Sequence, residues 1–288
     1  MDTDDDLGLF GPGSVTWRLH EEPILILAGL RSLYLQALDP RAMAGVAQNS
    51  HYKSDPWGRL MRTSMYVGTT IYGTTAEARA AGDRLRRLHA RLHATDPRTG
   101  ERFRVDEPDL LRWVHVTEVE SFLSTARRAG LALTDSEVDT YYTEQLRSAE
   151  LVGLDPATVP ATAAEVAVYY DAVQPELAMT REAAETMIFL TAPPIPWKLS
   201  MPLRLGLNLG PTRWAYFGIA GTALALLPPW ARRLYGGLGL PAIDVSADLS
   251  VRGWRLLLSA LPRKLKEGPL REAAMERAVR LGAVPTPA

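Results

Sequence analysis

Apolar residues recur at intervals of three and four along most of this chain, which is the spacing of one face of an α-helix. No run of alternating apolar and polar residues is bounded by hairpin turns, so the pattern predicts no β-sheet. The helices that it predicts cover residues 21–38, 40–49, 56–72, 76–94, 107–129, 136–150, 162–172, 181–190, 201–208, 212–227, 229–235, 244–260 and 267–281. We therefore expect an all-α fold, built as a single multi-helix domain.

Capping residues mark where several of these helices begin and end. An aspartate followed by proline suits a helix start, because the carboxylate accepts from free backbone N–H groups and proline fits the first turn. This pair occurs at Asp39-Pro40 and Asp55-Pro56. The capping-box spacing occurs at Thr74 and Glu77, Thr134 and Glu137, and Thr162 and Glu165. The glycines that suit helix ends are Gly73 and Gly130.

The most apolar stretch of the chain lies at residues 214–231 and carries no charge. Pro228 and Pro229 interrupt it, which leaves a helix over 214–227 of roughly 21 Å at about 1.5 Å per residue. A bilayer core of about 30 Å needs a longer helix, so we expect a buried core helix. The alternative is peripheral contact with a membrane surface. The aromatic residues that would form its interfacial belt are Trp214, Tyr216, Trp230 and Tyr235.

A proline-rich link at 191–202 is the strongest candidate for a domain boundary, yet its Ile195 and Trp197 indicate that it packs against the rest of the protein. We therefore expect one domain that continues into a C-terminal helical extension. Within residues 252–280, eight Lys and Arg stand against three Glu. This local charge predicts a solvated helix face or, alternatively, a surface for an anionic partner.

The composition excludes several classes of function. The chain has no cysteine, which removes disulfides, thiolate catalysis and cysteine-held metal centres. Its 32 basic and 33 acidic residues give a net charge of -1, so no basic field is available to bind nucleic acid. No Gly-x-Ser-x-Gly sequence supports a serine hydrolase. The N-terminal ten residues carry aspartates where a signal peptide carries positive charge, so a cytoplasmic location is expected.

Histidines are the scarce metal-binding residues here, with five in the chain. His89 shares one stripe of its helix with Gly82 and Leu85, so its ring is placed on the apolar face. Gly82 would leave a patch without a side chain on that face, against which a flat ligand could lie. The alternative for His89 is an ordinary hydrogen-bonded core residue. His20 and His51 are expected to be capping or surface groups.

His115 lies three residues before Glu118 on another predicted helix. A hydrogen bond from the imidazole to the Glu118 carboxylate would fix the tautomer and raise the basicity of the opposite nitrogen toward a metal. The alternative is a hydrogen-bonded pair that serves packing only.

Arg59, Thr63 and Tyr66 follow one helix face at steps of four and three, with Arg62 next to them. Arginines beside a threonine suit an anionic group such as a carboxylate. A polar stripe that faces solvent is the alternative.

Several of these segments occur together in a known family. They are GSVTWRL at 13–19, AGVAQNS at 44–50, RLMRT at 59–63, RRLHARLH at 86–93, LRWVH at 111–115 and LLPPWARRLYG at 226–236. The order and spacing of these segments resemble those of the DUF2236 family, the MpaB-type and rubber-oxygenase (latex-clearing protein) catalytic domain. The resemblance implies a haem-binding oxygenase domain over 12–236, with 237–288 as a helical extension packed on it.

The resemblance also implies a globin-like helical core and a b-type haem (heme b) whose iron is held by an axial histidine. On the family's pattern this metal ligand maps to His89, and the distal motif R-x-x-K-T maps to Arg59, Arg62 and Thr63. His115 would support the site or serve as a sixth iron ligand. The expected cofactor-binding residues are His89, Arg59, Tyr66, Gly82 and Leu85, and the expected catalytic residues are Arg59, Arg62, Thr63 and His115.

Two departures from the family's pattern limit the chemistry expected. Arg62 stands where the rubber-cleaving enzymes have a lysine, and a guanidinium cannot ligate iron. Residues 40–50 contain no carboxylate, although the catalytic glutamate of those enzymes belongs to this segment. Polyisoprene cleavage by their mechanism is therefore not expected. We expect a haem-dependent oxygenase that uses dioxygen on a small or extended hydrophobic substrate; the alternative is a non-enzymatic helical protein that binds haem or a hydrophobic ligand.

Overall fold

Helices joined by short connections make up nearly all of the computed structural model, which describes residues 6–194, 211–237, 239–262 and 268–285. They are α1 (Val15–His20), α2 (Leu25–Gln36), α3 (Pro40–Asn49), α4 (Pro56–Tyr72), α5 (Thr75–His89), α6 (Pro108–Arg128), α7 (Asp135–Val152), α8 (Ala163–Val173), α9 (Arg181–Thr191), α10 (Pro211–Ala225), α11 (Pro229–Leu234), α12 (Pro241–Ser259) and α14 (Pro269–Arg280). Short 3-10 turns lie at Pro156–Thr158 and Gln174–Glu176. The all-α prediction is confirmed, and the helix predicted at 201–208 lies outside the described residues.

The predicted caps account for the positions of the helix ends. The Asp39 side chain accepts from the first turn of α3, and Asp55 does the same for α4. Complete capping boxes begin α5 and α7, and they are formed by Thr74 with Glu77 and by Thr134 with Glu137. These contacts are local in sequence, which is why the sequence pattern could predict them.

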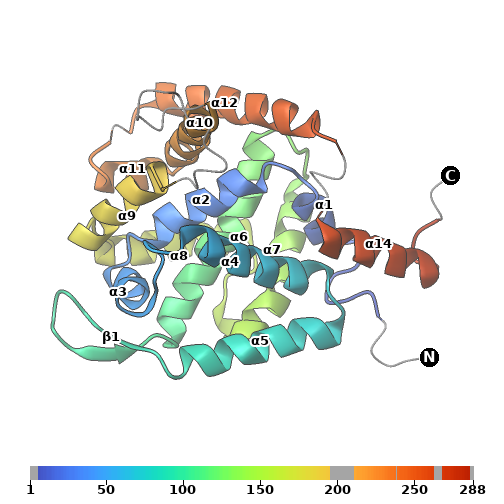
Figure 1. The fold of residues 1–288 in the computed structure, drawn as a ribbon, viewed down its shortest axis with the longest axis horizontal. Coiled ribbons are helices and arrows are strands. Elements are labelled where there is room, and N and C mark those ends of the chain that lie inside the picture. The colour runs from blue at the N-terminus through green and yellow to red at the C-terminus, as the bar shows by residue number, and fades with distance from the viewer. Residues whose placement is uncertain (1–5, 195–210, 238, 263–267, 286–288) are drawn as a thin grey trace.

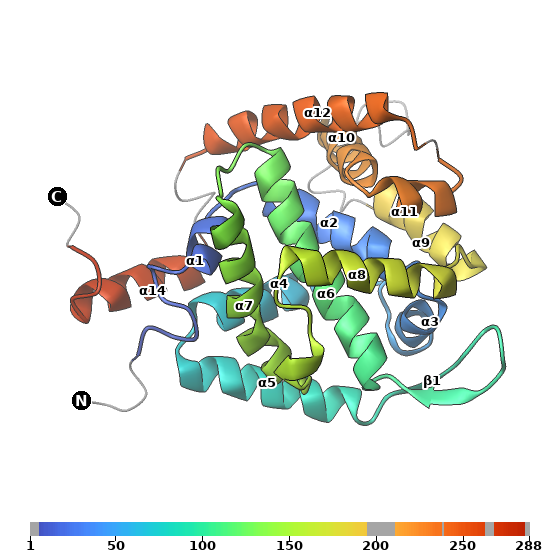
Figure 2. The ribbon, with the colours of Figure 1, turned by 180° about the vertical axis from the view of Figure 1, so that it is seen from behind.

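The centre of the molecule is the pair α2 and α6, which cross with the most extensive helix contact in the fold (Figure 1). After α6 the chain turns at Gly130, whose φ of 103° needs a glycine, and α7 returns beside α6 (Figure 2). α8 and α10 complete the cover of this core. Its largest enclosed side chains include Trp113 and Tyr34, which are 2% and 0% exposed.

A buried arginine connects the central pair to the last third of the chain. Arg31 of α2 is 2% exposed and forms an ion pair with Glu120 of α6. Its guanidinium also donates to Ser121 Oγ at 2.7 Å and to the Leu226 carbonyl at 3.0 Å. The Tyr170 hydroxyl donates to the same Glu120 carboxylate at 3.3 Å. Arg31 and Glu120 therefore connect α2, α6, α8 and the segment after α10 through buried hydrogen bonds.

The apolar stretch predicted as a core helix forms α10, which packs on α2 and carries fully buried Ala220 and Ala223. Its other side is partly open, since Trp214 is 62% exposed. None of the described helices is long and apolar enough to cross a membrane. After α10, Arg232 of α11 binds the Asp244 carboxylate of α12 through two hydrogen bonds of 2.8 and 2.9 Å.

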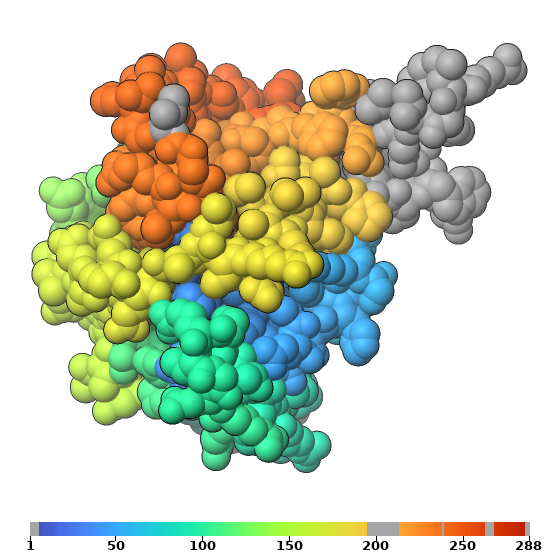
Figure 3. All heavy atoms as spheres, turned by 90° about the vertical axis from the view of Figure 1, so that its left-hand side faces the viewer, coloured from blue at the N-terminus to red at the C-terminus, as the bar shows by residue number. Residues whose placement is uncertain are grey.

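A small β hairpin corrects the sequence-based prediction. The helix predicted over 76–94 ends at His89, and β1 (His93–Thr95) pairs in antiparallel fashion with β2 (Arg102–Arg104). Gln48 of α3 exchanges two hydrogen bonds of 2.9 Å with the backbone of Thr95. Strand pairing and this contact with α3 satisfy the backbone groups, so tertiary contacts override the helical pattern. Figure 3 shows the hairpin below α9 at one end of the molecule.

α14 lies at the end of the molecule opposite the hairpin (Figure 1). α4 packs on α5, and α14 lies across α4 with the Leu270 side chain beside Gly68. Arg277 of α14 donates to the Tyr72 carbonyl at 2.7 Å and to the Asp6 carbonyl at 2.6 Å. The C-terminal helix is thus fixed to the first half of the chain.

Candidate functional site

Two titratable side chains of α6 are enclosed by protein without a partner. His115 and Glu118 are three residues apart on one face, and neither has a hydrogen bond or ion pair among the described residues. Burial lowers the pKa of His115 to about 4 and raises the pKa of Glu118 to about 7. By accessible surface both side chains are half-buried. The predicted hydrogen bond between them is not formed.

Tyr66 of α4 faces the same region from the other side. Burial raises its pKa to about 12, and the charge of Glu118 adds to the increase, so the two side chains lie near one another. The Tyr66 hydroxyl is enclosed, and no described residue gives it a hydrogen bond of good geometry, although the Thr70 hydroxyl lies near it. A buried hydroxyl without a partner is costly, so the arrangement favours a bound group that supplies one.

His20, the last residue of α1, is another member of this set of unpartnered groups. The prediction that it is a capping or surface group is therefore wrong. Its ring packs edge-on against Phe122 of α6 with the centroids 5.0 Å apart, and Tyr141 of α7 lies on its other side at 6.4 Å. Burial lowers its pKa to about 3. His20 Nε2 and the Tyr141 hydroxyl are both buried without a partner. The sequence placed His20 at a helix end but gave no sign that the end is covered.

The middle of α4 is not pressed against the body of the protein. Six successive residues, 60–65, are all exposed. Because each residue of a helix turns by about 100°, six in a row point in every direction around the axis. Some of these exposed side chains therefore lie on the side of α4 that faces the body of the protein.

The distal residues predicted on α4 do not stay together. Arg59 is largely buried, donates to Ser50 Oγ at 2.7 Å and has no carboxylate partner in the described part of the chain; burial lowers its pKa. Arg62 instead points to solvent, with a side chain that is 70% exposed and pairs with Asp55 at 3.1 Å. Arg62 therefore faces solvent beside the capping carboxylate of α4, and its predicted role beside a cofactor stays a prediction. Thr63 is also exposed.

The predicted residues of α5 have different surroundings. A side chain at Gly82 would meet the Leu151 carbonyl at 2.7 Å, so the open patch predicted there is wrong: α7 fills it. Leu85 is half-buried. His89 is half-buried at the last residue of α5, where burial lowers its pKa and the Asp106 carboxylate partly offsets this. His89 has no hydrogen-bond partner among the described residues.

The chemistry of these groups fits a haem better than a bare metal ion. Neutral imidazole is the form that ligates iron, and burial holds both His89 and His115 in that form. Arg59 is a buried cation that a propionate could neutralise. The described residues hold no group of three or more His, Asp or Glu placed to bind a metal ion. A haem iron needs only one such ligand, because the porphyrin occupies four coordination positions.

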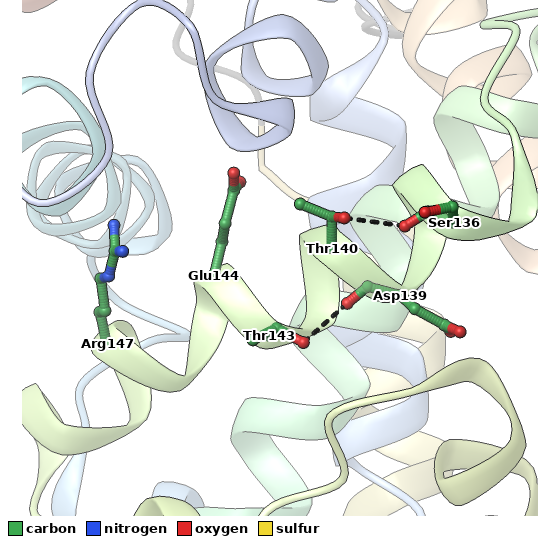
Figure 4. Close-up of a pocket in the computed structure, with 6 residues that line it drawn as sticks. All are labelled: Ser136, Asp139, Thr140, Thr143, Glu144 and Arg147. Atoms are coloured by element: carbon green, nitrogen blue, oxygen red, sulfur yellow. Dashed lines mark hydrogen bonds between the residues drawn. The ribbon is translucent and has the colours of Figure 1, made fainter.

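Two surface grooves lie elsewhere. The first, of about 480 Å³, runs along α7, where Thr140 and Thr143 donate to carbonyls of their own helix (Figure 4). Its Glu144 caps α1 by accepting from the N–H groups of Val15 and Thr16. The second, of about 400 Å³, lies between α6 and α7. Because the polar groups of the first groove already bond within the fold, it offers no comparable set of unpartnered groups.

One family model matches most of the chain. The model described as ER-bound oxygenase mpaB/B'/Rubber oxygenase, catalytic domain, covers residues 17–261. No curated protein and no solved structure matches the chain. The match includes most of α1 and the whole of α4, α5, α6 and α7. These helices carry all the unpartnered groups described above.

Proposed function

The chain belongs to the family of the mpaB and rubber oxygenase catalytic domains, and from this membership we propose that it is a haem-dependent oxygenase acting on a hydrophobic substrate. The observation that carries the proposal is the set of enclosed, unpartnered groups on facing sides of α4 and α6. Haem b would supply the dioxygen chemistry when bound.

The residues of this chain would hold the cofactor and prepare its surroundings. His89 would be the axial ligand, as the family's pattern assigns, and its neutral ring is ready to bind iron. Arg59 would neutralise a propionate, since it is half-buried and has no carboxylate partner among the described residues. Tyr66 and His115 would lie on the substrate side, where the Tyr66 hydroxyl can donate a hydrogen bond.

In the proposed site, Glu118 would be the group that holds a proton. Residues 40–50 contain no carboxylate, whereas α6 places the Glu118 carboxyl group near Tyr66. With a pKa raised to about 7, it can hold and release a proton near neutral pH. The apolar residues around it, among them Phe122, would exclude water from the substrate.

The test is the absorption spectrum of protein purified from cells supplied with haem. We expect a Soret band that is lost in His89→Ala and kept in His93→Ala, whose histidine lies exposed on β1. A wild-type protein without a Soret band would overturn the proposal. A band that survives His89→Ala and disappears in His115→Ala would move the axial ligand to α6.

A non-enzymatic haem or hydrophobic-ligand carrier is the second candidate, and the lack of a carboxylate in α3 favours it. The two are distinguished by dioxygen uptake with terpenoid or fatty substrates. An oxygenase consumes dioxygen faster than the same amount of free haem, and a carrier does not.

A further inference from the structure

One face of α5 carries three exposed arginines around an exposed leucine. Arg84, Arg87 and Arg91 are exposed, and Leu88 is 54% exposed. The four residues follow at i, i+3, i+4 and i+7, with Arg91 in the turn that continues the helix, so their side chains are neighbours. We call these four residues the α5 face. The helix lies along the lower edge of the molecule in both ribbon views (Figures 1 and 2).

The fold leaves the three arginines of the α5 face without a carboxylate. None of them has a hydrogen bond or an ion pair among the described residues. Arg86 differs, because it pairs with Asp83 and donates to the Leu151 carbonyl at 2.7 Å. That pair engages the carboxylate nearest to the α5 face in the sequence. Glu77 is engaged as well, since it accepts from the Thr74 N–H at 2.8 Å.

The α5 face is turned away from the helices that pack on α5. Gly82, where α7 packs on α5, lies about 160° around the helix axis from Arg84. Ala78, which is fully buried, lies one turn before Gly82 on the same side. Glu150 of α7 is exposed and has no ion pair in the described part of the chain, and it belongs to the helix on that opposite side. The cations of the α5 face are therefore free to bind a group from outside.

From these observations we propose that the α5 face is a docking surface for another protein, which presents a helix with carboxylates at the same spacing around an apolar side chain. A guanidinium binds a carboxylate through two parallel hydrogen bonds, and arginine is enriched in protein interfaces. Leu88 would supply the apolar contact, in the i, i+3, i+4 and i+7 pattern by which helices dock. This inference does not depend on the proposed oxygenase activity.

Other occupants fit the α5 face less well. A second copy of the chain in a symmetric pair would set arginine against arginine, and like charges oppose such contact. A helix that lies on a membrane needs a broad apolar face, whereas the four positions here hold one leucine and three cations. Nucleic-acid binding draws on many phosphate contacts, and the whole chain has a net charge of -1.

The experiment measures binding of the full chain to a fluorescent helical peptide by anisotropy. The peptide carries Glu at i, i+3 and i+7 and Leu at i+4, and a second peptide carries Gln in place of Glu. We expect the Glu peptide to bind at least about tenfold more tightly than the Gln peptide, and less tightly as salt is raised. Replacing the three arginines of the α5 face by glutamine should remove this difference.

The matched control removes the same charge from exposed positions on three other helices, as Arg127→Gln, Arg181→Gln and Arg233→Gln together. It should keep the preference for the Glu peptide. A wild-type protein that binds the two peptides equally would overturn the proposal, and so would equal losses in the two triple variants.

Binding to phosphatidylglycerol vesicles that needs the three arginines, without a preference for the Glu peptide, would also overturn the proposal and assign the α5 face to a lipid surface. Because the substituted side chains are exposed and have no partner among the described residues, circular dichroism should show the same melting temperature for wild type and the α5-face variant. A lower melting temperature would mean that these arginines serve the fold instead.

Discussion

Replacing Glu118 by glutamine is expected to change how stability depends on pH. Burial raises the pKa of Glu118 from 4.5 to about 7 in the folded protein. Between these values the folded protein holds a proton that the unfolded chain has lost, so the free energy of unfolding falls as the pH rises through this window. Each unit of pKa difference corresponds to about 1.36 kcal/mol, so the full loss approaches about 3 kcal/mol.

The buried histidines act in the opposite direction. The pKa values of His115 and His20 are lowered to about 4 and about 3, so below the ordinary value of 6.5 the unfolded chain binds protons that the folded protein does not. They therefore raise stability as the pH rises to about 6.5. Because wild type and Glu118→Gln share both histidines, subtracting one free energy of unfolding from the other removes the contribution of the histidines.

The measurement is urea unfolding of both proteins from pH 4.5 to pH 8, followed by circular dichroism. The stability of Glu118→Gln relative to wild type should rise by up to about 3 kcal/mol across this range. Burying the glutamine amide without a partner costs about 1–3 kcal/mol at every pH, so only the slope is diagnostic. Glu150→Gln, at an exposed glutamate of α7, is the matched control for the substitution. A flat difference for Glu118→Gln would refute an enclosed, unpartnered carboxyl group.

Two further substitutions test the packing around the site. Arg31→Leu leaves Glu120 without its buried cation and should destabilise the protein by about 3–5 kcal/mol in chemical denaturation, whereas replacing both residues by leucine should cost less; equal losses would mean that an unpaired Glu120 carries no penalty. Gly82→Val places a side chain against the Leu151 carbonyl and should cost about 1–3 kcal/mol, seen as a lower melting temperature in scanning calorimetry; an unchanged melting temperature would show that α5 and α7 are loosely packed there.

Helix positions were predictable from the sequence because the features that set them are local. Thr134 and Glu137 bond each other's backbone within one turn, and Gly130 takes the positive φ that ends α6. Thr162 shows the limit of the pattern. It caps α8 as predicted, but the Glu165 side chain accepts from Ala161 and not from the cap residue itself.

The site was less predictable because its features depend on contacts between distant segments. The stripe of α6 identified His115 and Glu118, but only the fold shows that neither finds a partner in the described part of the chain. Arg62 shares a helix with Arg59 and still points away, since Asp55 lies within reach. The residues near His20 in the sequence do not indicate that the Phe122 ring covers it. Residues separated by a hundred positions decide these environments, and a helical repeat does not encode them.

The bond from Arg31 to the Leu226 carbonyl has a consequence for synthesis on the ribosome. The two residues are 195 positions apart. At roughly 5–20 residues per second, the second emerges about 10–40 s after the first. For that time the face of α2 that α10 later covers is open to the surroundings, although α6 is already made. The nascent chain is therefore expected to need a chaperone during this interval, and slowing translation should increase its aggregation.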